Sequence, residues 1–267
     1  MTAKRGEFRP VGRALAAAAL LGGALSAVTA AAASETDATA ILKAMSDYMS
    51  AQSTISLTFD SDIEVITPQM EKIQFTNSGE ALLSRPDKLR ARRVGGYSDV
   101  ELIFDGKTVS IHGRSVNGYA KIEAPGTVDQ LIGSLRVGHG IALPGADLLL
   151  SRPYDILIAG VREAKYIGRG IIDGRECEHL AFRNFDTDWQ IWVEVSERPM
   201  PCKMVITSKT VNSAPQYTLR IKAWQTGIEI APNAFAFSPP KGAEPLDPKA
   251  LMELDELPPP MEYGENK

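Results

Sequence analysis

The first regular pattern along the chain is helical. A helix beginning near Thr36 is predicted by apolar residues three or four positions apart on one face: Ile41, Leu42, Met45, Tyr48 and Met49. Ser34 and Asp37 are placed to form a capping box at its start. From Ser53 the period changes to two, which predicts that a β-strand follows this helix directly.

Short alternating runs separated by turn residues predict a series of further strands. These runs are 72–83, 88–94, 100–104, 107–111, 118–123, 164–168, 176–182, 189–195, 202–209, 216–224 and 235–237. Asn77-Ser78-Gly79 is expected to break the first run. Asp105-Gly106 is expected to form a tight hairpin, because glycine accepts the positive φ of such a turn. Connections of a few residues favour an antiparallel meander.

The middle of the chain has a helical pattern instead. Val128, Leu131, Ile132 and Leu135 fit one helical face, and 146–150 and 154–158 predict one or two shorter helices. Helices inserted among hairpins must cover one face of the sheet, since nothing else can bury their apolar side chains. The predicted fold class is mainly β with helices (α+β), with an N-terminal helix and mid-chain helices covering the concave face of an antiparallel sheet.

The first 33 residues resemble a secretory signal peptide. Basic residues up to Arg13 precede an uncharged apolar run from Ala14 to Val28, and small residues follow. This run has 15 residues, fewer than the roughly 20 that a membrane-spanning helix needs. Cleavage is expected between Ala30 and Ser34, which predicts a periplasmic protein that does not span the membrane after signal cleavage.

Charge and length limit the classes of partner that this chain can bind. Residues 1–33 carry four basic groups and one acid, so removing them changes the formal charge from -4 to -7. A mildly acidic chain has no basic cluster with which to bind nucleic acid. With 44% hydrophobic residues, one domain over 34–240 can bury a substantial core. Residues 241–267 are acidic and proline-rich and are expected to form a flexible tail, with a short helix near 249–254.

Two cysteines, Cys177 and Cys202, are a disulfide candidate in an oxidising compartment, and two separate buried thiols are the alternative. Cys177, His179 and Cys202 would supply only three zinc ligands, whereas structural zinc sites usually have four with tighter spacing. We therefore predict no metal site and no cofactor.

No catalytic constellation emerges from the sequence. The three histidines, His112, His139 and His179, follow no metalloprotease spacing, and the chain has no Gly-x-Ser-x-Gly motif. In the segment from Asp186 to Trp192, two acids meet two tryptophans, a combination that can bind or cleave sugars. A turn that enters an aromatic-rich strand explains the same residues, so a hydrolase that uses Asp188 ranks as a third hypothesis.

The strands and mid-chain helices together supply apolar side chains for a ligand cavity. The candidates to line such a cavity beneath a curled sheet are Leu57, Phe59, Leu102, Phe104, Leu131, Leu135, Leu148 and Leu149. A filled hydrophobic core would produce the same pattern, so the sequence leaves both interpretations open.

Several motifs also carry a family resemblance over nearly the whole mature chain. They are Arg85-Pro86-Asp87-Lys88-Leu89-Arg90, Tyr119-Ala120, Ala124-Pro125-Gly126-Thr127-Val128-Asp129, Ala146-Asp147-Leu148-Leu149, His179-Leu180-Ala181-Phe182-Arg183, Asp188-Trp189-Gln190-Ile191-Trp192 and Pro215-Gln216-Tyr217. With them the chain resembles the predicted periplasmic proteins called domain of unknown function 2092, whose fold is similar to the lipoprotein carriers LolA and LolB. This resemblance implies a strongly curved half-barrel with helices as a lid, which encloses acyl chains.

The leading hypothesis is therefore a periplasmic protein that binds or carries a hydrophobic small molecule or lipid without catalysis. Displacement of the helices would open its cavity. The alternative is a structural or interaction module whose acidic tail and edge strands engage another protein of the cell envelope.

Overall fold

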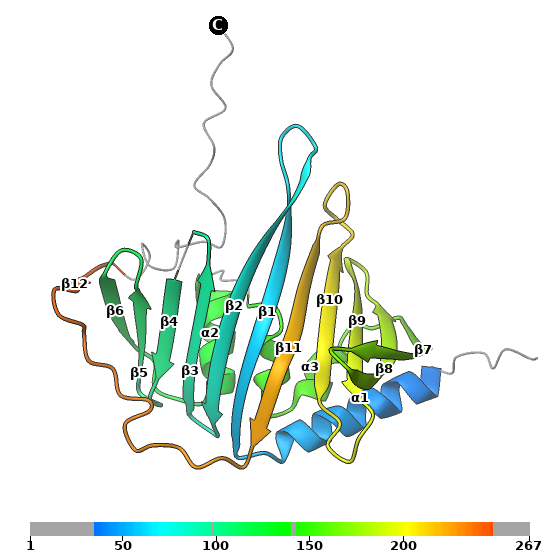
Figure 1. Ribbon diagram of the computed structural model, residues 1–267, viewed down its shortest axis with the longest axis horizontal. Coiled ribbons are helices and arrows are strands. Elements are labelled where there is room, and N and C mark those ends of the chain that lie inside the picture. The colour runs from blue at the N-terminus through cyan, green and yellow to red at the C-terminus, as the bar shows by residue number, and fades with distance from the viewer. Residues whose placement is uncertain (1–34, 98, 140–142, 248–267) are drawn as a thin grey trace, which may run out of the picture. The chain divides into compact units, whose positions relative to one another are not determined.

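An open, curved sheet of twelve strands organises the part of the chain that the structure describes. The computed structural model describes residues 35–97, 99–139 and 143–247, which leaves the predicted signal peptide, Ser34 and the predicted helix at 249–254 outside (Figure 1). The helical elements are α1 (Glu35–Ser50), α2 (Val128–His139), the 3₁₀ helix η1 (Ala146–Leu149) and α3 (Pro153–Leu157). The strands are β1 (Thr54–Ile66), β2 (Lys72–Ser84), β3 (Lys88–Gly95), β4 (Asp99–Phe104), β5 (Thr108–Gly113), β6 (Gly118–Glu123), β7 (Glu163–Ile172), β8 (Arg175–Arg183), β9 (Thr187–Glu194), β10 (Pro201–Ser208), β11 (Gln216–Thr226) and β12 (Glu244–Pro245).

The strand order divides the sheet into two antiparallel meanders. One runs from β1 to β6 and the other from β7 to β11, and they meet where β1 pairs with β11. This seam joins residues far apart in the sequence, such as Ile55 and Thr226. Strands β7 and β12 lie at the two edges of the sheet, which is therefore open. The predicted mainly β fold, with antiparallel strands and helices, is confirmed.

The helices cover the sheet through the apolar faces that the sequence predicts. Helix α1 buries Ala38, Leu42, Met45 and Met49 completely, and it packs against β7, β8, β9 and α3. Helix α2 buries Val128, Leu131, Ile132 and Leu135. A capping box starts α2, because the backbone N–H of Thr127 donates to the side chain of Gln130 and the hydroxyl of Thr127 accepts from the N–H of Gln130.

The predicted break at Asn77-Ser78-Gly79 is wrong, because β2 continues through all three residues. β1 and β3 pair with this part of β2 from both sides, and this long ladder overrides the local turn preference. Gly79 has a packing role instead. A Cβ atom there would lie 2.6 Å from the carbonyl oxygen of Arg92 and would also overlap the ring of Phe59. The missing side chain lets that ring lie across β2.

The predicted strand at 235–237 is also wrong, since Phe235 is the last residue of a turn and residues 236–237 form no strand. Its rings serve in packing. The ring of Phe237 lies 6.1 Å from His112 and 5.7 Å from Tyr119, and the ammonium of Lys121 lies 5.5 Å from its centre. The alternation of Phe235 and Phe237 therefore reflects aromatic packing against a neighbouring surface and not a ladder of hydrogen bonds.

Two further links join strands within the sheet. A disulfide joins Cys177 of β8 to Cys202 of β10, the pair for which the sequence favours a bridge. Residues Glu244–Pro245, at the start of the predicted tail, form β12 and pair in parallel with β6. A flexible tail stays a prediction for residues 248–267, which lie outside the described residues.

Candidate functional site

The inner face of the first meander changes from large to small side chains along its strands. One row of register partners across β1 to β4 consists of Ile55, Leu83, Leu89 and Phe104, all buried. The next row consists of Leu57, Ala81, Ala91 and Leu102. We call these the large row and the alanine row. Two adjacent alanines in the middle of the sheet leave empty space above them. In the large row the bigger side chains occupy the corresponding space.

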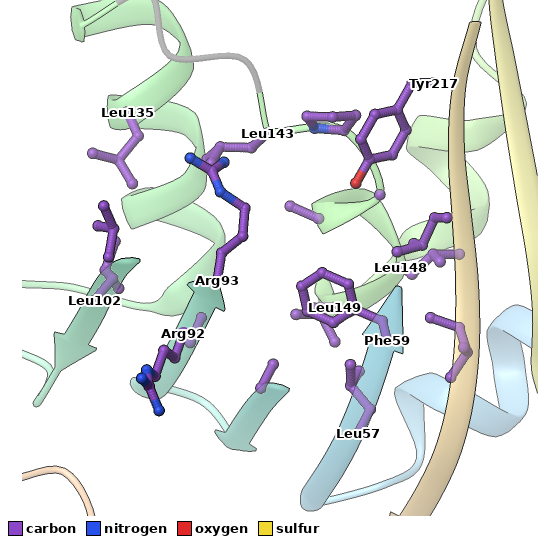
Figure 2. A pocket seen from close by; sticks show the side chains of 18 of the residues that line it. Leu57, Phe59, Arg92, Arg93, Leu102, Leu135, Leu143, Leu148, Leu149 and Tyr217 are labelled. Carbon is purple, nitrogen blue, oxygen red and sulfur yellow. The ribbon is translucent and has the colours of Figure 1, made fainter. Parts of the chain in front are cut away.

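A cavity of about 270 Å³ lies over the alanine row. Its volume is close to the lower end of the roughly 300–1,000 Å³ of small-molecule pockets. The lining is mostly apolar, and it comprises Leu57, Phe59, Ala81, Ala91, Arg92, Arg93, Val100, Leu102, Ile111, Leu135, Leu143, Pro144, Gly145, Ala146, Leu148, Leu149, Tyr217, Leu219, Ile221 and Trp224. Figure 2 shows leucines of the helical segments facing Leu57 and Phe59 of β1.

Six of the eight residues that the sequence nominates line this cavity: Leu57, Phe59, Leu102, Leu135, Leu148 and Leu149. The other two do not. Phe104 belongs to the fully buried large row, and Leu131 is buried on α2 one turn before Leu135. Both side chains pack in the hydrophobic core and are not among the residues that line the cavity.

Sequence reasoning missed the residues of β3 and β11 that complete the wall. The alternation in β11 already contains the signal, because Tyr217, Leu219 and Ile221 occupy every second position. The alanines gave a weaker signal, since a small residue inside a strand is informative only once its partners across the sheet are known.

Gly145, directly before η1, lies close to β11. Gly145 has φ +82°, a left-handed conformation that favours glycine, and a Cβ atom there would lie 2.7 Å from Leu219. The backbone thus approaches β11 more closely than any other residue type would allow. This contact helps η1 to present Leu148 and Leu149 to the cavity.

Hydrogen bonds hold the helical segments over the sheet. The guanidinium of Arg85, after β2, donates to the carbonyl of Gln52 at 3.1 Å and to the carbonyl of Leu150 at 3.0 Å. Burial lowers the pKa of Arg85. Within the helical layer, Arg136 of α2 pairs with Asp147 of η1. The ion pair therefore joins α2 to η1, and Arg85 joins the end of η1 to the end of β2.

One cationic side chain of the inner face lies in the cavity. Arg93 follows the alanine row on β3, where its register partners are Gly79 and Val100. Figure 2 shows its side chain projecting from β3 toward Leu143, and it shows the hydroxyl of Tyr217 pointing into the same space. The cavity is thus apolar along the alanine row and polar at one end.

The Asp188 segment has the features of a structural turn and strand. Asp188 pairs with Lys209 at 3.0 Å and with Arg183 at 3.3 Å. Burial raises the pKa of this carboxyl, but the two cations outweigh that effect and leave the pKa below its ordinary value. Such a carboxylate stays ionised and is a poor proton donor.

The two tryptophans of this segment do not share a site. Trp189 is buried and stacks on Phe182, with ring centres 4.1 Å apart. Trp192, three positions later, stacks on His179 at 4.1 Å. Burial lowers the pKa of His179, although a hydrogen bond with Gln190 opposes the shift. The rings serve different stacks and do not form one sugar-binding platform.

Metal-binding and membrane-spanning features are missing from the described ranges. Within them, no three His, Cys, Asp or Glu side chains gather as a metal site would require. Cys177 and Cys202 are occupied in their disulfide. Over residues 35–97, 99–139 and 143–247, each helix falls short of the length or apolar character needed to cross a membrane.

Comparison with known proteins places the chain in a family. The family model described as "Predicted periplasmic protein (DUF2092)" matches residues 38–247. No curated protein matches the chain.

Several solved structures are distantly similar to this chain. Lipoprotein LppX of Mycobacterium tuberculosis is 13% identical, with 74% of this chain and 100% of that chain covered and a TM-score of 0.46. LprF of Mycobacterium bovis is 14% identical, with 76% of this chain and 99% of that chain covered and a TM-score of 0.47. A putative outer membrane lipoprotein-sorting protein domain of Vibrio parahaemolyticus is 9% identical, with 76% of this chain and 97% of that chain covered and a TM-score of 0.34.

Proposed function

This chain belongs to the DUF2092 family of predicted periplasmic proteins, and from that premise we propose that it is an exported carrier that binds a hydrophobic ligand without catalysis. The ligand is a lipid acyl chain or an apolar molecule of similar width. It lies in the cavity over the alanine row, between the sheet and the helical segments. The cavity itself is the observation that carries this proposal.

The chemistry of the wall supports an apolar ligand. Leucine, isoleucine, phenylalanine and alanine side chains make most of the surface, so the main favourable contribution is removal of apolar area from water. Such binding tolerates different chain lengths and saturation patterns, because it depends on area more than on directed contacts.

The absence of a chemical step is part of the proposal. The hydrolase candidate Asp188 is held as an ion pair, and it is not among the residues that line the cavity. A carrier needs only to bind and release. Release requires the helical segments to move away from the sheet, and the hydrogen bond from Arg85 to the carbonyl of Leu150, directly after η1, resists that movement.

Filling the cavity tests this function directly. Ala91→Phe places a ring over the alanine row, where there is space for it, so the variant is expected to fold and to lose binding of the neutral dye Nile red. Val94→Phe adds the same ring on the solvent-exposed outer face of β3 and serves as the matched control. Equal dye binding by wild type and Ala91→Phe would refute the cavity as the site. Lipid extraction from purified wild-type protein gives a second readout, with copurified lipid expected in wild type and reduced in Ala91→Phe.

The interaction-module alternative stays a prediction, because the tail that it invokes lies mostly outside the described residues. The test is deletion of residues 248–267, which spares β12. Lipid binding that persists while an envelope partner is lost would assign the tail to a separate function.

A further inference from the structure

The ring of Phe59 has unequal neighbours on its two sides. In the register of the sheet, Phe59 of β1 lies opposite Ile221 of β11 and Gly79 of β2. Ile221 is only 2% exposed, so its side chain already fills the space on the β11 side. Gly79 has no side chain, and a Cβ atom there would overlap the ring. The ring therefore extends across β2, and Figure 2 shows it turned away from β11 and toward β3.

This ring lies at one end of the alanine row. Along the inner face of β1, Phe59 comes directly after Leu57 of that row, and Ser61 comes next. Along the inner face of β2, Gly79 is followed by Asn77, the register partner of Ser61. Both of these polar residues are buried. Over β1 and β2, the apolar surface therefore ends at the ring, and the next row is polar.

The opposite end of the alanine row is closed by the hydrophobic core. There the large row supplies a buried side chain from each of β1 to β4. Phe104 of the large row is completely buried and does not line the cavity, whereas Phe59 is only partly buried and does line it. Over β1 and β2, one end of the cavity thus depends on several core residues and the other on a single ring.

We infer that Phe59 sets the length of chain that the cavity can enclose, and that the ligand is therefore a lipid with a single short chain. This inference rests on the proposed function and narrows it from any apolar molecule to a chain of limited length. A chain over the alanine row meets the ring where the apolar surface ends. Each methylene takes about 30 Å³, so a longer or second chain would not fit in 270 Å³ and would remain partly in water.

Selectivity for chain length tests this assignment. The affinities of alkan-1-ols from hexan-1-ol to hexadecan-1-ol are measured by isothermal titration calorimetry for wild type and Phe59→Ala. In wild type, affinity should level off once the chain fills the cavity. In Phe59→Ala the space of the ring is added, so the length at which affinity levels off should increase by about four to six carbons. An alcohol four carbons longer than the wild-type limit should then bind Phe59→Ala more tightly than wild type by about tenfold or more.

Further substitutions separate a wall from a merely structural ring. Phe59→Leu keeps an apolar side chain and should increase the limiting length by about two carbons, whereas Phe59→Trp should decrease it. Phe237→Ala removes the same ring from its place beside His112 and Tyr119, outside the cavity lining, and should leave the limit unchanged. Urea midpoints show whether each variant is folded. Loss of stability alone would not move the limiting length.

The outcomes distinguish this inference from the proposed function. A limiting length that is the same in wild type, folded Phe59→Leu and folded Phe59→Trp overturns the role of Phe59 and leaves a carrier whose cavity ends elsewhere. Because these two substitutions change the volume of the side chain in opposite directions, they decide the matter even if Phe59→Ala does not fold. Failure of every alcohol to bind wild type, together with unchanged Nile red binding by Ala91→Phe, overturns the carrier itself.

Discussion

The cavity predicts how affinity depends on the length of the bound chain. Filling 270 Å³ at about 24 cal/mol per Å³ stabilises the complex by about 6 kcal/mol. Burial of one methylene contributes about 0.8 kcal/mol. The cavity is therefore filled by about eight methylenes, and each of these is expected to raise affinity by about fourfold.

The assay uses neutral alkan-1-ols from hexan-1-ol to hexadecan-1-ol, so that the charge of Arg93 does not enter. Affinities from isothermal titration calorimetry, which does not need the dye that Ala91→Phe is expected to lose, should rise steeply with each methylene and level off near about eight to ten carbons, the length that fills the cavity. The plateau reflects additional methylenes that remain in water. In Ala91→Phe it should occur several methylenes earlier, and in Val94→Phe it should not move.

Two results would refute this reasoning. Affinity independent of chain length would mean that the alcohols do not enter an apolar space. A constant increase through hexadecan-1-ol, in wild type and Ala91→Phe alike, would mean that the chains bind another, larger apolar surface.

Three predictions concern stability. Arg85→Ala removes both hydrogen bonds from its guanidinium to backbone carbonyls and should lower the free energy of unfolding by about 2 kcal/mol in urea titration. Replacing Cys177 and Cys202 by serine opens a cross-link between residues 25 positions apart and should cost about 3 kcal/mol by the same titration. Burial lowers the pKa of His112, so the unfolded chain binds this proton at higher pH than the native protein does. Stability is then complete above about pH 6.5 and falls on acidification, and His112→Phe should weaken that fall.

Matched measurements control each of these. Arg162→Ala removes an arginine whose guanidinium lies over the exposed ring of Phe185, and it should change stability little. A reductant should destabilise the wild type and leave the double serine variant unchanged. Burial also lowers the pKa of His179. His179→Gln should therefore remove part of the acid dependence of stability that persists in His112→Phe. An unchanged pH profile in His112→Phe would contradict the assignment.

Local patterns predicted most of the helices and hairpins. The apolar face of α1 and the Asp105-Gly106 turn depend on residues close together in the sequence, so their periods were sufficient. The turn signal at Asn77-Ser78-Gly79 failed because pairing with β1 and β3, which is not local, decided its conformation. The Phe235–Phe237 alternation failed because a period of two does not distinguish a strand from two rings on a surface.

The cavity was predictable only in part for the same reason. Leu57 and Phe104 are both apolar strand residues, and only the register shows that one lies in the alanine row and the other in the large row. Arg93 was not nominated, because an arginine after a run of alternating residues looks like a solvent-exposed side chain until its face of the strand is known. Side-chain size and sheet register together determine which apolar residues form a wall and which form a core.

The seam between β1 and β11 has a consequence for how the protein folds. β1 is followed directly by β2, so one of its edges is paired early. The strand that covers its other edge begins only at Gln216, after nine intervening strands (β2 to β10) and every helix of the described residues. Until that strand is made, the free edge of β1 can pair with any other exposed strand. Closing so long a loop is slow compared with forming a hairpin. A chain truncated before residue 216 would keep this edge open and should aggregate, even though every residue of its first meander is present.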